Sequence, residues 1–230
     1  MELNQRQKDI LGLVNEKQRV TVQYLAKVLF FSEMTVRRDL DKLERGGYLK
    51  RYHGGAIALS QAVQYPIEQR MHINEQEKRR MAKQAEKHLR NGQTVFILGS
   101  STCAYLLPCL RSFEDLHIFT NSVQFLQILS EMKIRCTLSG GEYFVADKIL
   151  LGRVAENFFR SMNYDIAIIA CDGIDEDGTV TVIREDGAEL VRIGFRNAAK
   201  RIVIADHTKL GCRGTYNVCN TGEADDVIVI

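Results

Sequence analysis

The sequence lacks any long run of apolar residues. No stretch approaches the roughly 18 consecutive apolar residues that a membrane-spanning helix requires, and residues 1–9 are polar where a signal peptide would begin its apolar segment. These two absences exclude a membrane partner and a secreted class of protein. We therefore expect a cytoplasmic protein.

Paired cysteines are missing as well. The six cysteines lie singly, with no CxxC pair and no histidine companion at metal-ligand spacing. The pattern gives no metal site and no cofactor site, and it favours cysteines that act as small buried side chains. Cys103 is the exception, because it lies at an expected helix start, where a thiolate would be stabilised.

The length and the charge distribution indicate two domains. A chain of 230 residues with 45% hydrophobic content suffices for one small and one medium domain, each with its own core. The net charge of +2 hides an asymmetry, since residues 1–60 hold 11 Lys and Arg against 7 Asp and Glu. An excess of cations in one part of the chain is typical of a domain that binds a phosphate backbone.

Three apolar stripes at helical spacing predict three helices in the first part of the chain. The first stripe lies in residues 10–14, the second in residues 22–29 after the capping residue Thr21, and the third in residues 36–43 after the capping residue Ser32. The opposite face of the third helix is cationic where a buried helix would be apolar. This face therefore points at a polyanion.

The second helix of a helix-turn-helix enters the major groove, where residues of its first turns contact base edges and flanking cations hold phosphates. After the glycine pair that ends the third helix, residues 48–51 alternate apolar and cationic side chains before His53 and the glycines at 54 and 55. This pattern predicts a small hairpin, or wing. The alternative is a small helical bundle with a solvated charged face. We assign DNA contacts to Ser32, Thr35, Arg37, Arg38, Lys42, Lys50, Arg51 and His53.

The segments SEMTVRRDL (Ser32–Leu40) and YHGGA (Tyr52–Ala56) resemble the DeoR family of bacterial transcription regulators. The resemblance implies a winged helix-turn-helix repressor whose second domain senses a phosphorylated sugar. We accordingly expect a DNA-binding domain at residues 1–57, a linker at 58–73 and a sensor domain at 74–230. The partners implied are a double-stranded DNA operator, a phosphorylated sugar effector and a second copy of the chain, in a dimer or tetramer.

The sensor domain should begin with a helix from Asn74 that Gly92 closes. The basic run 78–80 on this helix is interpreted as a solvated face, and the alternative is a contact with ligand or DNA. From Thr94 onward, short apolar runs alternate with helical patterns. This alternation predicts an α/β fold with a mostly parallel sheet. Pro108 falls in the helix expected after the first strand and should end or kink it.

Ligands of such sheets gather at the carboxyl ends of the strands, where helix N-termini present free backbone N–H groups. The turn at residues 99–102 is small and rich in hydroxyls, as a phosphate cradle needs, although such residues are also ordinary helix caps. Carboxylates and a lysine at later strand ends suit sugar hydroxyls and a phosphate; the alternative for residues 172–178 is a plain turn. The candidate ligand residues are Ser100, Ser101, Thr102, Asn121, Ser122, Gly140, Gly141, Asp172, Asp175 and Lys209.

The segment DGIDEDG and the later Asp206-x-x-Lys209 also resemble ribose-5-phosphate isomerase, whose fold we expect the sensor domain to share. The lysine- and glycine-rich stretch that follows in the isomerase is missing here. We therefore expect a sugar phosphate to be sensed and not converted, with no catalytic residue. Two alternatives stay open, an isomerase-type enzyme and a DNA-binding protein that responds to no ligand.

Overall fold

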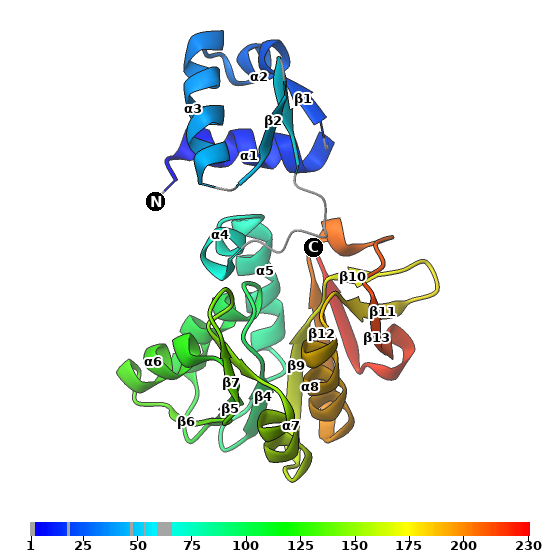
Figure 1. The fold of residues 1–230 in the computed structure, drawn as a ribbon. Helices are drawn as coiled ribbons and strands as arrows, with labels where there is room; N and C mark the ends of the chain where they lie inside the picture. The colour runs from blue at the N-terminus through cyan, green and yellow to red at the C-terminus, as the bar shows by residue number, and fades with distance from the viewer. Residues whose placement is uncertain (1–2, 18, 47, 53, 59–65) are drawn as a thin grey trace. The chain divides into compact units, whose positions relative to one another are not determined.

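The computed structural model divides into two compact units, Met1–Asn74 and Glu75–Ile230 (Figure 1). No helix in the described part of the chain is long and apolar enough to cross a membrane. His53 and the side chain of Lys50 lie outside this part, so their assignments stay predictions. The described residues are 3–17, 19–46, 48–52, 54–58 and 66–230.

Three helices pack around the core of the first unit, as the apolar stripes predict. They are α1 (Gln5–Lys17), α2 (Val22–Leu29) and α3 (Glu33–Arg45). Burial of each large aliphatic side chain contributes roughly 1.5–3 kcal/mol, so the stripes account for the packing of the helices. Buried residues from all three stripes meet in one cluster: Ile10, Leu11, Val14, Val22, Leu25, Val36, Leu40 and Leu43.

Side-chain hydroxyls begin the second and third helices. Thr21 Oγ1 accepts a hydrogen bond from the backbone N–H of Tyr24 at 3.1 Å, and Ser32 Oγ accepts one from Thr35 at 3.2 Å. These caps satisfy amide groups that have no partner within the helix. Between the helices, Phe30 adopts a left-handed conformation with φ of 57° and ends α2. The sequence did not predict this conformation, because bulky residues disfavour it.

The two strands that follow α3 form the predicted wing. Antiparallel pairing joins β2 (Lys50–Tyr52) to β3 (Gly55–Ile57), and an unpredicted strand, β1 (Arg19–Thr21), pairs with the other side of β3. Gly55 is required at this pairing, because a Cβ atom there would lie 2.1 Å from the carbonyl oxygen of Val20. The first unit is therefore a winged helix-turn-helix.

Part of the stretch expected to be a linker is helical. The helix α4 (Ile67–Met71) belongs to the first unit, and Ile67 is fully buried. Gln69 donates from Nε2 to the carbonyl oxygen of Gly46, at 2.7 Å, and so ties α4 to the end of α3. Residues 59–65 of the expected linker lie outside the described residues.

A six-stranded parallel sheet forms the centre of the second unit, which confirms the predicted α/β architecture. Four consecutive residues of the central strand β9 are buried, as expected for a strand covered on both faces. In spatial order the strands are β14 (Asp226–Val229), β12 (Ala198–Ala205), β9 (Tyr164–Ala170), β4 (Thr94–Ile97), β5 (His117–Thr120) and β6 (Arg135–Leu138).

The helices of this unit are α5 (Glu75–Glu86), α6 (Val123–Glu131), α7 (Arg153–Arg160) and α8 (Glu185–Arg196). The segment after β4 departs from the predicted α-helix. It is a 3₁₀ helix, η1 (Cys103–Ser112), with Pro108 inside it. Proline has no N–H for the α-helical ladder, so the prediction that it disturbs the helix was right in kind, although the whole segment is affected.

Two small antiparallel additions were not predicted, because their strands are short and lie among turns. A hairpin leads from β6 to α7, and a second sheet of three strands flanks α8 in the sequence. The hairpin consists of β7 (Glu142–Phe144) and β8 (Ile149–Leu151), and the small sheet of β10 (Gly173–Ile174), β11 (Thr179–Val182) and β13 (Tyr216–Asn220). Two single 3₁₀ turns complete the unit, η2 (His207–Lys209) and η3 (Thr221–Glu223).

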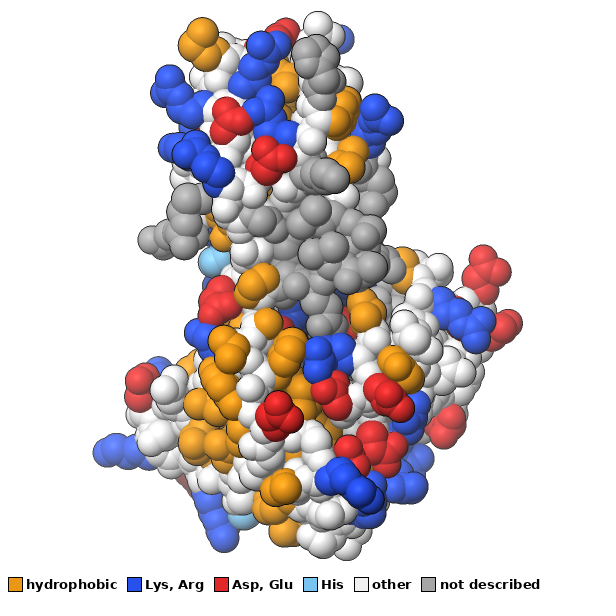
Figure 2. Space-filling view, viewed as in Figure 1, with side chains coloured by type: hydrophobic (Ala, Val, Ile, Leu, Met, Phe, Trp, Pro, Cys, Tyr) orange, Lys and Arg blue, Asp and Glu red, His pale blue; other side chains and the backbone are white. Residues whose placement is uncertain are grey.

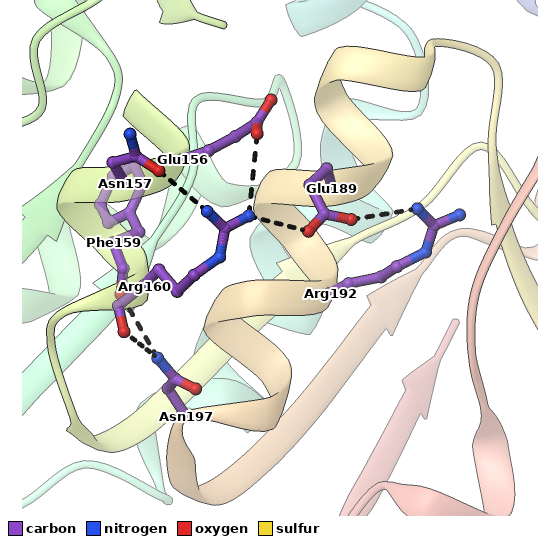
Figure 3. Close-up of polar contacts among 7 residues, drawn as sticks. All are labelled: Glu156, Asn157, Phe159, Arg160, Glu189, Arg192 and Asn197. Carbon is purple, nitrogen blue, oxygen red and sulfur yellow. Dashed lines mark hydrogen bonds and ion pairs between the residues drawn. The ribbon is translucent and has the colours of Figure 1, made fainter. Parts of the chain in front are cut away.

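Polar side chains join α7 to α8 (Figure 3). The guanidinium of Arg160 lies 3.3 Å from Glu189, which Arg192 also contacts at 3.3 Å. Asn197, just after α8, donates from Nδ2 to the carbonyl oxygens of Phe159 and Arg160 at the end of α7. Exposed ion pairs each contribute little, whereas the amide satisfies carbonyls that have no partner within the helix.

Candidate DNA-binding surface and effector site

The outward face of α3 carries exposed cations. Arg37, Arg38 and Lys42 are all exposed, and Lys and Arg side chains gather over this helix in Figure 2. Arg37 lies 3.0 Å from Glu33, whereas Arg38 and Lys42 have no ion-pair partner within the described part of the chain. These two cations can therefore meet a polyanion without breaking an internal pair.

The first turn of α3 supplies small hydroxyl groups. Ser32 is exposed, and its Oγ lies 2.9 Å from Oγ1 of the half-buried Thr35. A hydroxyl has one donor and two acceptor positions, so both side chains keep hydrogen-bonding capacity beyond the cap. Their place in the first turn is where a helix-turn-helix contacts base edges.

Arg51 has a different environment from the predicted one. Its guanidinium pairs with Asp41 of α3, and its backbone N–H donates to Glu44 at 2.7 Å. The side chain is only 25% exposed. Arg51 thus attaches the wing to α3, and a phosphate at this position would have to compete with Asp41.

A buried carboxylate that the sequence analysis missed holds α3 against α1. Asp39 is 1% exposed, accepts a hydrogen bond from Gln7 Nε2 at 3.0 Å and pairs with Arg6. A buried charge is stable only when it is paired and hydrogen-bonded. Its position between Val36 and Leu40 on the buried stripe is the signal that could have revealed it.

The predicted effector residues follow adjacent strands of the parallel sheet. The turn 99–102 follows β4, Asn121 and Ser122 follow β5, Asp172 follows β9, and Lys209 lies in η2 after β12. These four strands are neighbours in the order β12-β9-β4-β5. Because parallel strands end at a common edge, the structure brings these segments together where such folds bind ligands.

The turn after β4 presents unused backbone donors. Ser100 Oγ caps the turn by accepting from the N–H of Cys103 at 3.0 Å. The backbone N–H groups of Ser100, Ser101 and Thr102 donate to no acceptor among the described residues. Free N–H groups at the start of a helix favour an anion, so the turn keeps the chemistry of a phosphate cradle.

A buried lysine reaches this turn from α5. Lys78 is 3% exposed, and its Nζ lies 3.2 Å from Oγ of Ser101, itself 6% exposed. The prediction of a solvated face is wrong for this residue, because Lys78 precedes Met81 and Ala85 by three and seven residues and shares their buried side. A buried ammonium is costly unless negative or polar groups meet it. Lys78 therefore adds positive charge to the candidate cradle.

Asn121 positions the turn from β5. Its Oδ1 accepts the backbone N–H of Gly99 at 2.9 Å, and its Nδ2 donates to the carbonyl oxygen of Leu150 at 3.1 Å. The approach is close enough that a Cβ atom on Gly99 would lie 2.5 Å from Ile149. Asn121 is 2% exposed, and these two hydrogen bonds hold the turn in place.

The two candidate aspartates serve their own loops. Asp172 accepts the backbone N–H of Ile183 at 2.9 Å. Asp175 accepts from Asp177 at 3.1 Å and from Thr179 at 2.8 Å, and so closes the Asp- and Gly-rich turn. For Asp175 the geometry favours the plain turn that the sequence also allowed.

Ser122, Gly140 and Gly141 shape the edge of the sheet. Ser122 is fully buried and caps α6 through the N–H of Phe125 at 3.2 Å. Gly140 and Gly141 are exposed and lead into β7. Ser139, beside them at the end of β6, has a buried hydroxyl with no partner among the described residues. A ligand hydroxyl would satisfy it.

Burial keeps the thiol of Cys103 protonated. The side chain is 1% exposed, and desolvation raises the pKa of its thiol to about 11. The predicted stabilised thiolate is therefore wrong, since loss of water disfavours the charged form more than the helix start favours it. Among the described residues no three His, Cys, Asp or Glu side chains form a metal-binding group.

A shallow depression of about 650 Å³ lies beside the exposed face of α5. Its cations Arg79 and Lys83 already pair with Glu75 and Glu86, at 2.7 Å and 2.8 Å. We therefore favour the cradle as the candidate anion site, because it has a buried lysine and N–H groups that donate to no acceptor among the described residues. The depression is lined by Arg79, Arg80, Lys83, Gln84, Val229 and Ile230.

Models of two known protein families match the two parts of the chain. The model for the DeoR-like helix-turn-helix domain matches residues 6–62, and the model for the DeoR C terminal sensor domain matches residues 73–229. The chain therefore belongs to the DeoR family of transcription regulators. It is a DNA-binding regulator and not an enzyme.

Relatives match along nearly the whole chain. The glycerol-3-phosphate regulon repressor of Escherichia coli (strain K12) is 28% identical and covers 99% of this chain and 90% of its own length. The HTH-type transcriptional regulator GlpR of Haloferax volcanii is 30% identical and covers 96% of this chain and 87% of its own length. The lactose phosphotransferase system repressor of Lactococcus lactis is 29% identical and covers 91% of this chain and 84% of its own length.

Solved structures resemble the chain in fold alone. The structure of eIF2B delta from Chaetomium thermophilum matches with a TM-score of 0.51 and 13% identity, and covers 67% of this chain and 56% of its own. Ribose 5-phosphate isomerase from Plasmodium falciparum matches with a TM-score of 0.44 and 18% identity, over 61% of this chain and 54% of its own.

Proposed function

We propose that the protein represses a carbohydrate-metabolism operon and that a phosphorylated sugar, bound in the second unit, changes its affinity for DNA. The observation that carries the effector proposal is the buried Lys78 beside Ser101 at the carboxyl edge of the sheet. Two relatives, a glycerol-3-phosphate regulon repressor and a lactose phosphotransferase system repressor, support the same class of regulated genes. We place the protein in the cytoplasm, with its operator.

The phosphate binds at the turn 100–102. A phosphate dianion is strongly hydrated, so a site must replace its water with several charge-assisted donors. The free N–H groups of the turn supply donors at the start of η1, and Lys78 and Lys209 supply positive charge. Asp172 and the buried hydroxyl of Ser139 face the sugar, where unmet hydrogen bonds penalise a ligand that lacks a hydroxyl.

The first unit reads DNA through α3. One small module offers little surface, so two copies of the chain bind a repeated half-site with two-fold symmetry. Ser32, Thr35, Arg37 and Arg38 meet base edges, and Lys42, Lys50 and His53 meet phosphates. A ligand alters operator affinity only through a difference in its own affinity for the two arrangements of the oligomer.

Calorimetry with phosphorylated and unphosphorylated sugars tests the effector site. The titrants are inorganic phosphate, glycerol phosphate, phosphorylated hexoses and the free hexoses. The wild type should bind a phosphorylated compound and not its free sugar. Lys78→Met should weaken binding about 10- to 100-fold, because a hydrogen bond to a charged group contributes about 1.5–3 kcal/mol.

The matched control is Lys83→Met, which removes an exposed lysine from the same helix. It should leave the affinity unchanged. Equal binding of free and phosphorylated sugars, or equal weakening by both substitutions, would contradict the phosphate assignment. Absence of binding by every compound would favour a regulator that responds to no sugar phosphate.

A further inference from the structure

Met34 is a large apolar side chain on the cationic face of α3. It is 72% exposed and lies in the first turn of the helix, two residues after the capping residue Ser32. Exposure of this much apolar surface on a helix that otherwise buries its apolar residues has no role in the folding of the first unit. The position is one from which a helix-turn-helix contacts base edges.

Helix geometry places Met34 opposite the core. At 100° per residue, Leu43 lies half a turn away from Met34 around the helix, and Leu43 is fully buried. Arg38, one turn after Met34, shares its outward direction and is exposed, as is Lys42 one turn later. Met34 therefore begins a row whose next members, Arg38 and Lys42, have no ion-pair partner among the described residues.

We propose that Met34 reads thymine, by packing its thioether side chain against the 5-methyl group in the major groove. The inference rests on the proposed entry of α3 into that groove. The surrounding cations select a polyanion as the occupant, and the thymine methyl is the apolar group that the major groove offers. A flexible thioether fits such a contact, and burial of both apolar surfaces stabilises the complex.

The nearby phenylalanines differ from Met34. Phe31 is 40% exposed, but its ring lies under the guanidinium of Arg6, with 5.0 Å from the carbon to the ring centroid. Phe30 is 92% exposed and lies outside α3, in the left-handed turn that ends α2. Phe30 is therefore a matched control, an exposed apolar side chain of the same unit that is not on the recognition helix.

Replacement of thymine by uracil tests the contact, because it removes the methyl group and leaves every hydrogen-bonding group in place. A duplex is first selected by the full-length wild type from a randomised pool. It is then resynthesised with deoxyuridine at one thymidine at a time, and affinities are measured by fluorescence anisotropy. At one or two positions in each half-site, the affinity of the wild type should fall about fourfold when deoxyuridine replaces thymidine. This is the factor expected for the loss of one buried methyl group.

Met34→Gln should bind the thymidine and deoxyuridine duplexes equally, because the side chain keeps its length and loses its apolar end. Phe30→Gln should keep the full penalty for deoxyuridine. A wild type that ignores every deoxyuridine substitution, or a penalty that survives in Met34→Gln, would overturn the thymine contact while leaving DNA binding intact. Failure to enrich any duplex would instead overturn the groove assignment on which the inference rests. Circular dichroism of both variants serves as the control for folding.

Discussion

The two units carry their candidate anion-binding cations in opposite ways. In the first unit, Arg38 and Lys42 stand exposed on α3 without ion-pair partners among the described residues. In the second, Lys78 is 3% exposed and hydrogen-bonded to Ser101. The difference fits the sizes of the two proposed partners, since a duplex is too large to enclose and a sugar phosphate is small enough to surround.

Exposure and burial give the same charge different properties. Exposed cations displace counterions from DNA, so their contribution falls steeply with salt and hardly depends on sequence. A buried lysine acts over a short distance in a region of low dielectric, where screening is weak. Operator binding should therefore be far more sensitive to salt than effector binding.

The largest expected effect comes from removing exposed cations from α3. Replacing Arg37 and Arg38 together with Ala should reduce the preference for a selected duplex at least tenfold, because each bidentate base contact contributes about 1–3 kcal/mol of discrimination. Competition binding against a scrambled duplex measures this preference. Sugar-phosphate binding should not change. Retention of both affinity and preference would show that α3 is not the recognition helix.

The next effect tests whether the two units are stable independently. Asp39→Ala leaves Gln7 and Arg6 without their acceptor and should destabilise the first unit by about 1–3 kcal/mol. Asp41→Ala removes a half-exposed carboxylate from the same helix and should cost less than about 1 kcal/mol. Scanning calorimetry of the full chain should show the lower transition temperature for Asp39→Ala, with the transition of the second unit unmoved. Equal losses in both variants would contradict the assigned role of Asp39.

The first unit could be predicted well from the sequence because its pattern is local. The caps Thr21 and Ser32 and the buried stripe through Val36 and Leu40 each occupy a few neighbouring residues. What escaped prediction was Asp39, whose partners lie more than 30 residues away in the chain. A carboxylate inside an apolar stripe does not disclose its partner.

The site of the second unit was only partly predictable. The candidate turn 100–102 was predicted from its hydroxyl groups and the pattern of strands, and the structure places it at the carboxyl edge of the sheet. Lys78 was assigned to a solvated face because the helical period is read from apolar residues, and a lysine on the buried face does not mark itself as buried. The sequence predicted that Asn121 lies at the carboxyl edge of the sheet. It could not predict the hydrogen bond from Gly99 to Asn121, because the two residues lie far apart in the chain.

A smaller effect, on the pH dependence of stability, is expected at the amino edge of the sheet, opposite the candidate effector site. The carboxylate of Asp165 accepts hydrogen bonds from the backbone N–H and the hydroxyl of Thr94, both at 2.7 Å, and these lower its pKa below the ordinary value of 3.8. A carboxyl group whose pKa is lower in the folded state than in the unfolded state stabilises the folded protein at any pH above the unfolded-state pKa. This stabilisation is lost as the pH falls through the folded-state pKa. The stability difference between the wild type and Asp165→Asn should therefore shrink below about pH 4.

Chemical denaturation at a series of pH values measures that difference. Asp165 precedes the buried centre of β9 and lies at its amino end, whereas the effector residues follow the carboxyl ends of the strands. Sugar-phosphate affinity should therefore be unchanged in Asp165→Asn. A stability difference that is the same at every pH would refute the role given to the carboxylate.

The most direct test of the whole account measures operator affinity with and without a phosphorylated sugar, in the wild type and in Lys78→Met. Anisotropy with the selected duplex gives both affinities at fixed salt. We predict that a compound bound in calorimetry changes the operator affinity of the wild type by about fivefold or more, the lower end of allosteric coupling, and leaves the operator affinity of Lys78→Met unchanged. An equal change in both proteins, or no change in a wild type that binds the compound, would contradict it.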